Sequence, residues 1–372
     1  MDLSVNFIGL SLKNPIIISA GPLTGSGEMM RKAVEAGVGA VVTKTIANEI
    51  RPNVRPRLVK GKGGIQNIEL YSDFSLEEWE NEIAYAKSYG AVVIANILGH
   101  TPSEIAYIAR TVEGFGADAL ELGVSCPHGE GLEGVVSEPT ELYNLTKEVV
   151  KRVDIPVMVK LSSNVSNIVK LAKAAEEGGA SAISGIDTVR SIAGVDIERG
   201  KTLLPTYGGY SGPAIRPLGL AAIASISQAI NIPVCGIGGI DSAQNVLEYM
   251  MLGASTVQIC TSIMLKGHEH IGKIIKDLEE WMDQHQHKSF QEIRGIALAS
   301  LKSFEEIKVE PYVSRVKNEC NKQCFEQCAK VCIYQAIEKQ GSRLQVNQEK
   351  CTGCGLCVSM CPNNVFELVW KE

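Results

Sequence analysis

No apolar run in this chain is long enough for an export signal or a membrane span. The first run, Pro15–Ile18, is short, and no later stretch approaches about 18 uninterrupted apolar residues. The chain also lacks a basic excess, because 36 Lys and Arg residues face 42 Asp and Glu residues. We therefore expect a cytoplasmic protein with no membrane or nucleic-acid partner. Disorder is excluded by the 45% hydrophobic content.

Cysteine is scarce in the first 319 residues, which hold three of the 11, Cys126, Cys235 and Cys260. The other eight lie between Cys320 and Cys361. Such density serves disulfides in small secreted scaffolds. Here it follows a long chain without an export signal, which favours metal ligation in a reducing compartment.

The last four cysteines have the bacterial ferredoxin spacing C-x2-C-x2-C-x3-C-P. In that pattern three thiolates hold one [4Fe–4S] cluster and the fourth ligates another. A second set with wider gaps lies upstream. The crossed rule assigns one cluster to Cys320, Cys324, Cys328 and Cys361, and the other to Cys351, Cys354, Cys357 and Cys332. A single cluster, or zinc in a four-cysteine site, is the alternative.

Eight short apolar runs alternate with amphipathic stretches over about 250 residues, the pattern of a TIM barrel. The expected strands are Ile16–Gly21, Ala40–Thr45, Val92–Leu98, Ala119–Ser125, Val157–Leu161, Ala182–Asp187, Val234–Gly239 and Thr256–Ser262. An α/β doubly wound sheet is the alternative, but no glycine-rich dinucleotide turn follows an early strand. We expect a (β/α)8 barrel over 1–265, a helical connector over 266–318, and a ferredoxin-like α+β domain over 319–372 with two clusters.

Function in such a barrel collects at the carboxyl ends of the strands. Lys44, Asn96 and Lys160 lie at three of these ends. A lysine at a buried strand end is costly unless an anion or a cofactor carbonyl meets it. These residues predict flavin mononucleotide (FMN), with its phosphate at Gly238 and Gly239, where a barrel binds phosphate on backbone N–H groups.

Cys126 follows the fourth strand in the glycine-rich loop 125–129. A thiol with a pKa of about 8.5 is a usable general acid, although a small buried hydrophobe is the alternative. For Cys235 and Cys260, inside apolar strands, we favour that alternative. Together the two halves predict one-electron clusters that exchange electrons with a flavin, which exchanges hydride with an organic substrate, in either direction.

The chain resembles the dihydropyrimidine dehydrogenases, in particular the short bacterial catalytic subunit that joins a flavin barrel to two ferredoxin clusters. Dihydroorotate dehydrogenases, which share the barrel and the flavin site, are a more distant resemblance. The resemblance is carried by Thr43–Thr45, Asn53–Arg57, Asn67–Leu70, Ser125–Gly129, Tyr207–Gly209, Ser211–Gly212, Ala214–Pro217, Gly238–Ser242, Leu301–Ser303 and Tyr334–Ile337.

The resemblance implies that Cys126 gives a proton to C5 of a pyrimidine ring while the flavin gives hydride to C6. It places Asn67, Glu69 and Thr188 on the substrate. The flavin set is Ala20, Lys44, Asn96, Lys160, Gly212, Gly238, Gly239 and Thr261. It also implies that electrons come from a separate flavoprotein subunit with FAD and NAD(P)H, or from a ferredoxin. Because clusters near a surface usually serve a docking partner, we expect an oligomer.

Two substrate positions depart from the family pattern. Gly123 and Asp187 stand where the family has asparagines that bond the pyrimidine. An ionised Asp187 accepts hydrogen bonds but cannot donate, which favours a substrate with more N–H donors or positive charge. The alternatives are therefore a reductase of a different heterocycle, an electron-transfer subunit with an inactive barrel, and a flavin-free phosphate-binding barrel such as an isomerase.

Overall fold

The computed structural model describes residues 2–124, 138–318, 320, 325–340 and 343–371. The candidate proton donor Cys126 and the candidate ligand Cys324 lie outside these residues. The chain divides into two compact units, Met1–Ser300 and Leu301–Glu372. No helix within the described ranges combines the length and the apolar character that a bilayer span needs.

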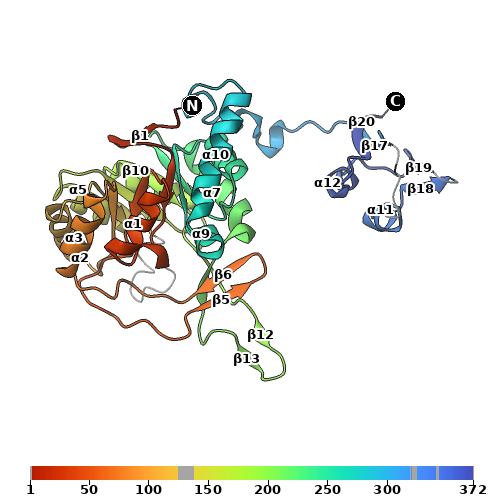
Figure 1. The fold of residues 1–372 in the computed structure, drawn as a ribbon. Coiled ribbons are helices and arrows are strands. Elements are labelled where there is room, and N and C mark those ends of the chain that lie inside the picture. Colours follow the sequence, from red (N-terminus) through yellow and green to blue (C-terminus); the bar gives the residue numbers. More distant parts are fainter. Residues whose placement is uncertain (1, 125–137, 319, 321–324, 341–342, 372) are drawn as a thin grey trace. The chain divides into compact units, whose positions relative to one another are not determined.

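The core of the first unit is a closed barrel of eight parallel strands (Figure 1). Their order around the barrel is β3 (Ile16–Ile18), β4 (Ala40–Val42), β7 (Val93–Ile97), β8 (Ala119–Leu122), β9 (Val157–Leu161), β10 (Ala182–Gly185), β15 (Val234–Ile237) and β16 (Thr256–Ile259). Every residue of these strands is buried, because helices cover the outside and side chains fill the inside. Each expected strand has its counterpart, and the predicted TIM barrel is confirmed.

Helices surround the barrel. They are α1 (Gly27–Glu35), α2 (Glu78–Ser88), α3 (Pro102–Gly114), α5 (Pro139–Val150), α6 (Ile168–Glu177), α7 (Arg216–Ser227), α8 (Ala243–Met251), α9 (Thr261–Lys266) and α10 (Glu269–Gln284). Four begin after a side chain that accepts a hydrogen bond from the first turn, namely Ser26, Thr101, Asn167 and Ser242. Helical turns of the 3-10 type cover Pro22–Thr24, Pro213–Ile215, Phe290–Glu292 and Leu298–Ser300 in this unit, and Phe304–Glu306 in the second unit.

The expected connector 266–318 is not a separate unit, because the division of the chain falls between Ser300 and Leu301. Its main helix, α10, belongs to the barrel unit. Helix α10 belongs to this unit because the residues of its apolar face, among them Ile271, Ile274 and Leu278, are buried in the barrel unit's core.

An N-terminal hairpin, β1 (Val5–Phe7) with β2 (Leu10–Leu12), closes the amino end of the barrel. Its Phe7 and Leu12 are each 1% exposed. They pack in one apolar cluster with inward-facing residues that include Ala40 and Ala119, the first residues of β4 and β8. The opposite, carboxyl end is therefore the end that can hold a ligand.

Strands that the sequence did not predict extend from the barrel (Figure 1). An antiparallel sheet has the order β11 (Val189–Ser191), β14 (Gly208–Ser211), β6 (Gly64–Asn67) and β5 (Leu58–Gly61). A further hairpin pairs β12 (Val195–Asp196) with β13 (Lys201–Thr202). The four-stranded sheet supplies residues to the cavity described below.

The second unit is built from short elements. Strand β17 (Tyr312–Val316) pairs with β20 (Phe366–Trp370), and β18 (Ile337–Gln340) pairs with β19 (Arg343–Val346). The helices are α11 (Phe325–Val331) and α12 (Leu356–Met360). Its small core gathers Ile337, Val365 and Phe366 with several cysteines, as expected of a ferredoxin-like α+β domain.

The tightness of the barrel interior can be tested with Ile17→Ala. Ile17 is fully buried between the hairpin and the strands, so the substitution should lower the free energy of unfolding of the barrel by about 2–5 kcal/mol. Denaturant unfolding followed by circular dichroism measures the change. Ile197→Ala is the matched control, because Ile197 is 85% exposed. Equal effects of the two substitutions would contradict this account of the interior.

Candidate functional site

A cavity lies at the carboxyl ends of the barrel strands, and each of the eight strands or the residue run after it contributes to its lining. Its empty volume is about 1170 Å³, including space open to solvent. The structure brings every described residue of the predicted substrate and flavin sets to this lining. They are Ala20, Lys44, Asn67, Glu69, Asn96, Gly123, Lys160, Asp187, Thr188, Gly212, Gly238, Gly239 and Thr261.

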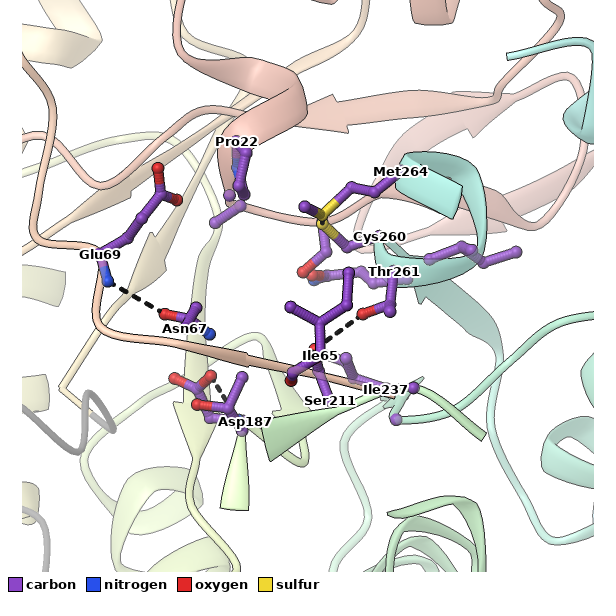
Figure 2. A pocket seen from close by; sticks show the side chains of 18 of the residues that line it. Pro22, Ile65, Asn67, Glu69, Asp187, Ser211, Ile237, Cys260, Thr261 and Met264 are labelled. Atoms are coloured by element: carbon purple, nitrogen blue, oxygen red, sulfur yellow. Dashed lines mark hydrogen bonds between the residues drawn. The ribbon is translucent and has the colours of Figure 1, made fainter. Parts of the chain in front are cut away.

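The polar residues predicted for the substrate gather on one side of the cavity, where Asn67 lies between Glu69 and Asp187 (Figure 2). Glu69 is held by two cations, with Lys44 Nζ 2.7 Å from its Oε2 and Arg57 Nε 2.8 Å from its Oε1. Its side chain is 8% exposed. The side chain of Asn67 accepts from the Glu69 N–H (3.3 Å) and donates to the Gly209 carbonyl (3.2 Å).

The two positions that depart from the family pattern have different surroundings. A Cβ atom at Gly123 would lie 2.5 Å from Asn96 Oδ1, so Asn96 now fills the space of any side chain at that position. Asp187 Oδ1 accepts the Thr188 N–H at 2.7 Å and lies 4.0 Å from Lys160 Nζ. Asp187 thus places a carboxylate beside Lys160, at the position where the resemblance to dihydropyrimidine dehydrogenases implies an amide.

A carboxylate that sequence reasoning missed lies beneath the cavity. Glu121, in β8, is 0% exposed and accepts from three groups. They are Asn96 Nδ2 at 2.8 Å, Ser184 Oγ at 2.8 Å and Gln258 Nε2 at 2.6 Å. Lys160 Nζ lies 3.8 Å from its Oε1. A charged residue inside the apolar run 119–122 was the available signal, because such a group is buried only with partners.

Glu121 fixes the direction of two side-chain amides. A carboxylate accepts only, so Asn96 and Gln258 both turn their NH2 groups toward it. Their carbonyl oxygens, Asn96 Oδ1 and Gln258 Oε1, are then buried with no hydrogen-bond partner among the described residues. Both residues line the cavity. A ligand that carries a ring N–H group, such as an isoalloxazine, would satisfy such an acceptor.

The lysines and the glycines also fit FMN. Lys44 and Lys160 are 8% and 5% exposed at the cavity, which suits an electron-rich ring. Gly212, Gly238 and Gly239 have φ angles of +106°, +120° and +71°. At Gly239 a Cβ atom would lie 2.8 Å from the Arg216 backbone nitrogen. Only glycine fits this backbone path, which brings peptide groups to the cavity for a phosphate.

Other lining residues were not predicted. Leu58, Ile65 and Ser211 come from the antiparallel sheet, and Ser211 Oγ accepts from Thr261 Oγ1 at 2.8 Å (Figure 2). Cys260, expected only as a buried hydrophobe, lines the cavity, and burial raises the pKa of its thiol to about 11. Cys235 is fully buried in the barrel, as expected, with a pKa of about 12. Neither thiol is suited to proton transfer near neutral pH.

In the second unit, four cysteines line one small cavity of about 350 Å³. They are Cys332, Cys351, Cys354 and Cys357, the set that the crossed rule assigned to one cluster. Of the other set, Cys320, Cys328 and Cys361 pack into the apolar core. No disulfide joins any described cysteine. Within the part of the chain that the structure describes, no three ligand side chains are gathered as a single metal ion would need.

Comparison with known proteins identifies a family for each part of the chain. Residues 2–282 match the family "Dihydroorotate dehydrogenase", and residues 344–367 match a 4Fe-4S binding domain. The catalytic subunit of dihydroorotate dehydrogenase B (NAD(+)) from Pyrococcus abyssi is 37% identical over 300 residues, which are 80% of this chain and 99% of that protein. The subunits of the same name from Thermococcus kodakarensis and Methanosarcina acetivorans are also 37% identical, over 302 and 297 residues.

These names correct the order of the two resemblances. The sequence motifs placed dihydropyrimidine dehydrogenases first, whereas the relatives named here are dihydroorotate dehydrogenases. Both resemblances rested on the same barrel and flavin motifs in the sequence, so those motifs alone did not separate the two families. The family match ends at residue 282, and the 4Fe-4S match lies beyond it.

The orienting role of Glu121 predicts a loss of FMN affinity in Glu121→Gln. The NH2 group of a glutamine at position 121 cannot accept a hydrogen bond, whereas Asn96 and Gln258 both donate to the carboxylate there. At least one of these two side-chain amides must therefore turn over or lose its hydrogen bond to residue 121. We expect the dissociation constant for FMN to rise about tenfold or more, for a cost of about 1–3 kcal/mol. Flavin fluorescence during equilibrium dialysis measures it. Glu141→Gln, on exposed α5 surface, is the control, and equal FMN affinity in both variants would refute the role.

Proposed function

Because the chain belongs to the dihydroorotate dehydrogenase family, we propose that it is an iron–sulfur flavoprotein that oxidises or reduces the CH–CH bond of a pyrimidine-like cyclic amide. That it is an oxidoreductase follows from the family, whose members bind FMN, and from the 4Fe-4S domain. The carrying observation is the cavity where two buried lysines face the Asn67, Glu69 and Asp187 side chains.

In this proposal cofactor binding, substrate binding and proton transfer are carried out by different residues of the chain. Bound FMN supplies hydride exchange with a ring carbon and one-electron exchange with iron–sulfur centres. Lys44 and Lys160 hold the electron-rich ring system, and Asn67 orients the substrate amide. Cys126 holds or returns the proton at its sulfur. It is three residues after Gly123, which lines the cavity.

The charges favour a neutral or cationic ring over a carboxylated one. The cations Lys44, Lys160 and Arg57 are offset by the carboxylates of Glu69, Asp187 and Glu121, and Glu69 is already paired with Lys44 and Arg57. A substrate carboxylate on this side would meet two carboxylates, whereas ring N–H or amino groups would find acceptors. We therefore propose an N–H-rich heterocycle. Dihydroorotate is the second candidate, which the names of the relatives favour.

Electrons would enter or leave through the 4Fe-4S domain, and the proposed partner is a separate flavoprotein subunit with FAD and NAD(P)H, or a ferredoxin. The relatives are named as catalytic subunits of an NAD(+)-dependent enzyme, which supports a second subunit. We also propose two clusters, on the crossed ligand sets, and an oligomer. The remaining alternative is a relay with an inactive barrel.

Cys126→Ala separates an enzyme from a relay. The substitution removes the proposed proton donor, so we expect substrate turnover to fall at least about 100-fold, the usual contribution of general acid catalysis. Dithionite should still reduce the protein at the wild-type rate. Stopped-flow absorbance follows both steps, and Cys235→Ala, which removes a thiol inside the barrel, is the control. Unchanged turnover in Cys126→Ala would rule out this donor.

Asp187→Asn tests the substrate class. The reduced protein is mixed with uracil, thymine, orotate, and amino-substituted pyrimidines, and reoxidation of the flavin is followed. We expect amino-substituted rings to be preferred by the wild type. In the variant, the ratio of kcat/KM for amino-substituted rings to that for uracil should fall about tenfold or more, because an amide can donate as well as accept. Asp196→Asn, in the β12–β13 hairpin, is the control. Efficient wild-type turnover of orotate would overturn the proposed class.

A further inference from the structure

One residue of the second unit donates hydrogen bonds toward two cluster cysteines from a strand that carries no ligand. Ser314 is the middle residue of β17 and is 2% exposed. Its backbone N–H donates to Cys351 Sγ at 3.2 Å, and its Oγ lies 3.2 Å from Cys357 Sγ. It lines the same small cavity as these two cysteines.

The direction of the second hydrogen bond follows from the chemistry of a bound cluster. The ligating sulfurs are thiolates and have no proton to give. Between Ser314 Oγ and Cys357 Sγ, the hydroxyl must therefore be the donor. Ser314 thus offers two donors, one N–H and one O–H, to two ligands of the 4Fe-4S match at 344–367.

Hydrogen-bond donors to ligating sulfurs stabilise the oxidised and the reduced forms of an iron–sulfur cluster to different extents. Reduction adds one electron to the cluster and increases the negative charge on its sulfurs, and no bond forms or breaks. A hydrogen bond to sulfur therefore stabilises the reduced form more than the oxidised form. The effect is strong at a buried position, where water cannot replace the donor.

We propose that the Ser314 hydroxyl raises the reduction potential of the cluster held by Cys351, Cys354 and Cys357. Ser314 is then a positioning and tuning residue, not a ligand. The backbone N–H to Cys351 survives any side-chain substitution, so the hydroxyl can be tested alone. This inference rests on the 4Fe-4S domain and is independent of the ring on which the barrel acts.

The test is a redox titration of the full-length protein, reduced with dithionite and monitored by electron paramagnetic resonance. In Ser314→Ala, the one-electron reduction constant of this cluster should fall about tenfold, a shift of about 59 mV to more negative potential. Ser359→Ala is the matched control. Ser359 lies between Cys357 and Cys361, but its hydroxyl donates to the Leu356 carbonyl at 3.0 Å. The reduction potential of the cluster in Ser359→Ala should therefore equal that of the wild type.

Iron and sulfide contents show whether each variant keeps its clusters. If Ser314→Ala does not, the Ser314→Thr and Ser314→Val pair provides the same comparison, because the two side chains have the same shape and differ in the hydroxyl. The threonine variant should then have the more positive potential. A potential equal to wild type in a cluster-bearing Ser314→Ala, or equal potentials in the pair, would overturn the proposal.

Discussion

Closure of the barrel is the constraint on which the candidate site depends. The pairing of β16 with β3 joins the last barrel strand to the first, with Val257 opposite Ile16 and Ile259 opposite Ile18. Because all eight strands run in the same direction, closure brings their carboxyl ends into one ring. Residues as distant in the chain as Ala20 and Thr261 therefore line one cavity.

Within that ring, charge is arranged in two layers. At the cavity, Glu69 pairs with Lys44, and Asp187 lies near Lys160. Beneath the cavity, Glu121 accepts hydrogen bonds from the side-chain amides of Asn96 and Gln258 and lies near the Lys160 ammonium group. Such buried charges persist only with partners, so the pairs set both the orientation of the polar groups and the local potential.

The fold was largely predictable from the sequence because completely buried strands read as continuous apolar runs. The antiparallel sheet was not, since β5 alternates between exposed and half-buried residues and β6 meets β14 through pairs such as Asn67 with Gly209, which are 142 residues apart. No local pattern encodes such a pairing.

The same distinction holds for the site. Lys44 and Asn96 could be placed because a strand end has a known position in a barrel. The role of Glu121 could not, because its partners Asn96, Ser184 and Gln258 come from three other strands. The glycine at position 123 was visible in the sequence, but coordinates were needed to show that Asn96 Oδ1 occupies the space of a side chain there.

The N-terminal hairpin limits the route by which a small molecule could reach the barrel cavity. Since Phe7 and Leu12 pack into the amino end of the barrel, the cavity at the carboxyl end would be the way in and out for a small molecule. If the proposed function holds, an incoming and a departing ring would use that opening in turn and exclude one another. Electrons would need no open passage, so the redox state of the protein could change while a ring is still bound.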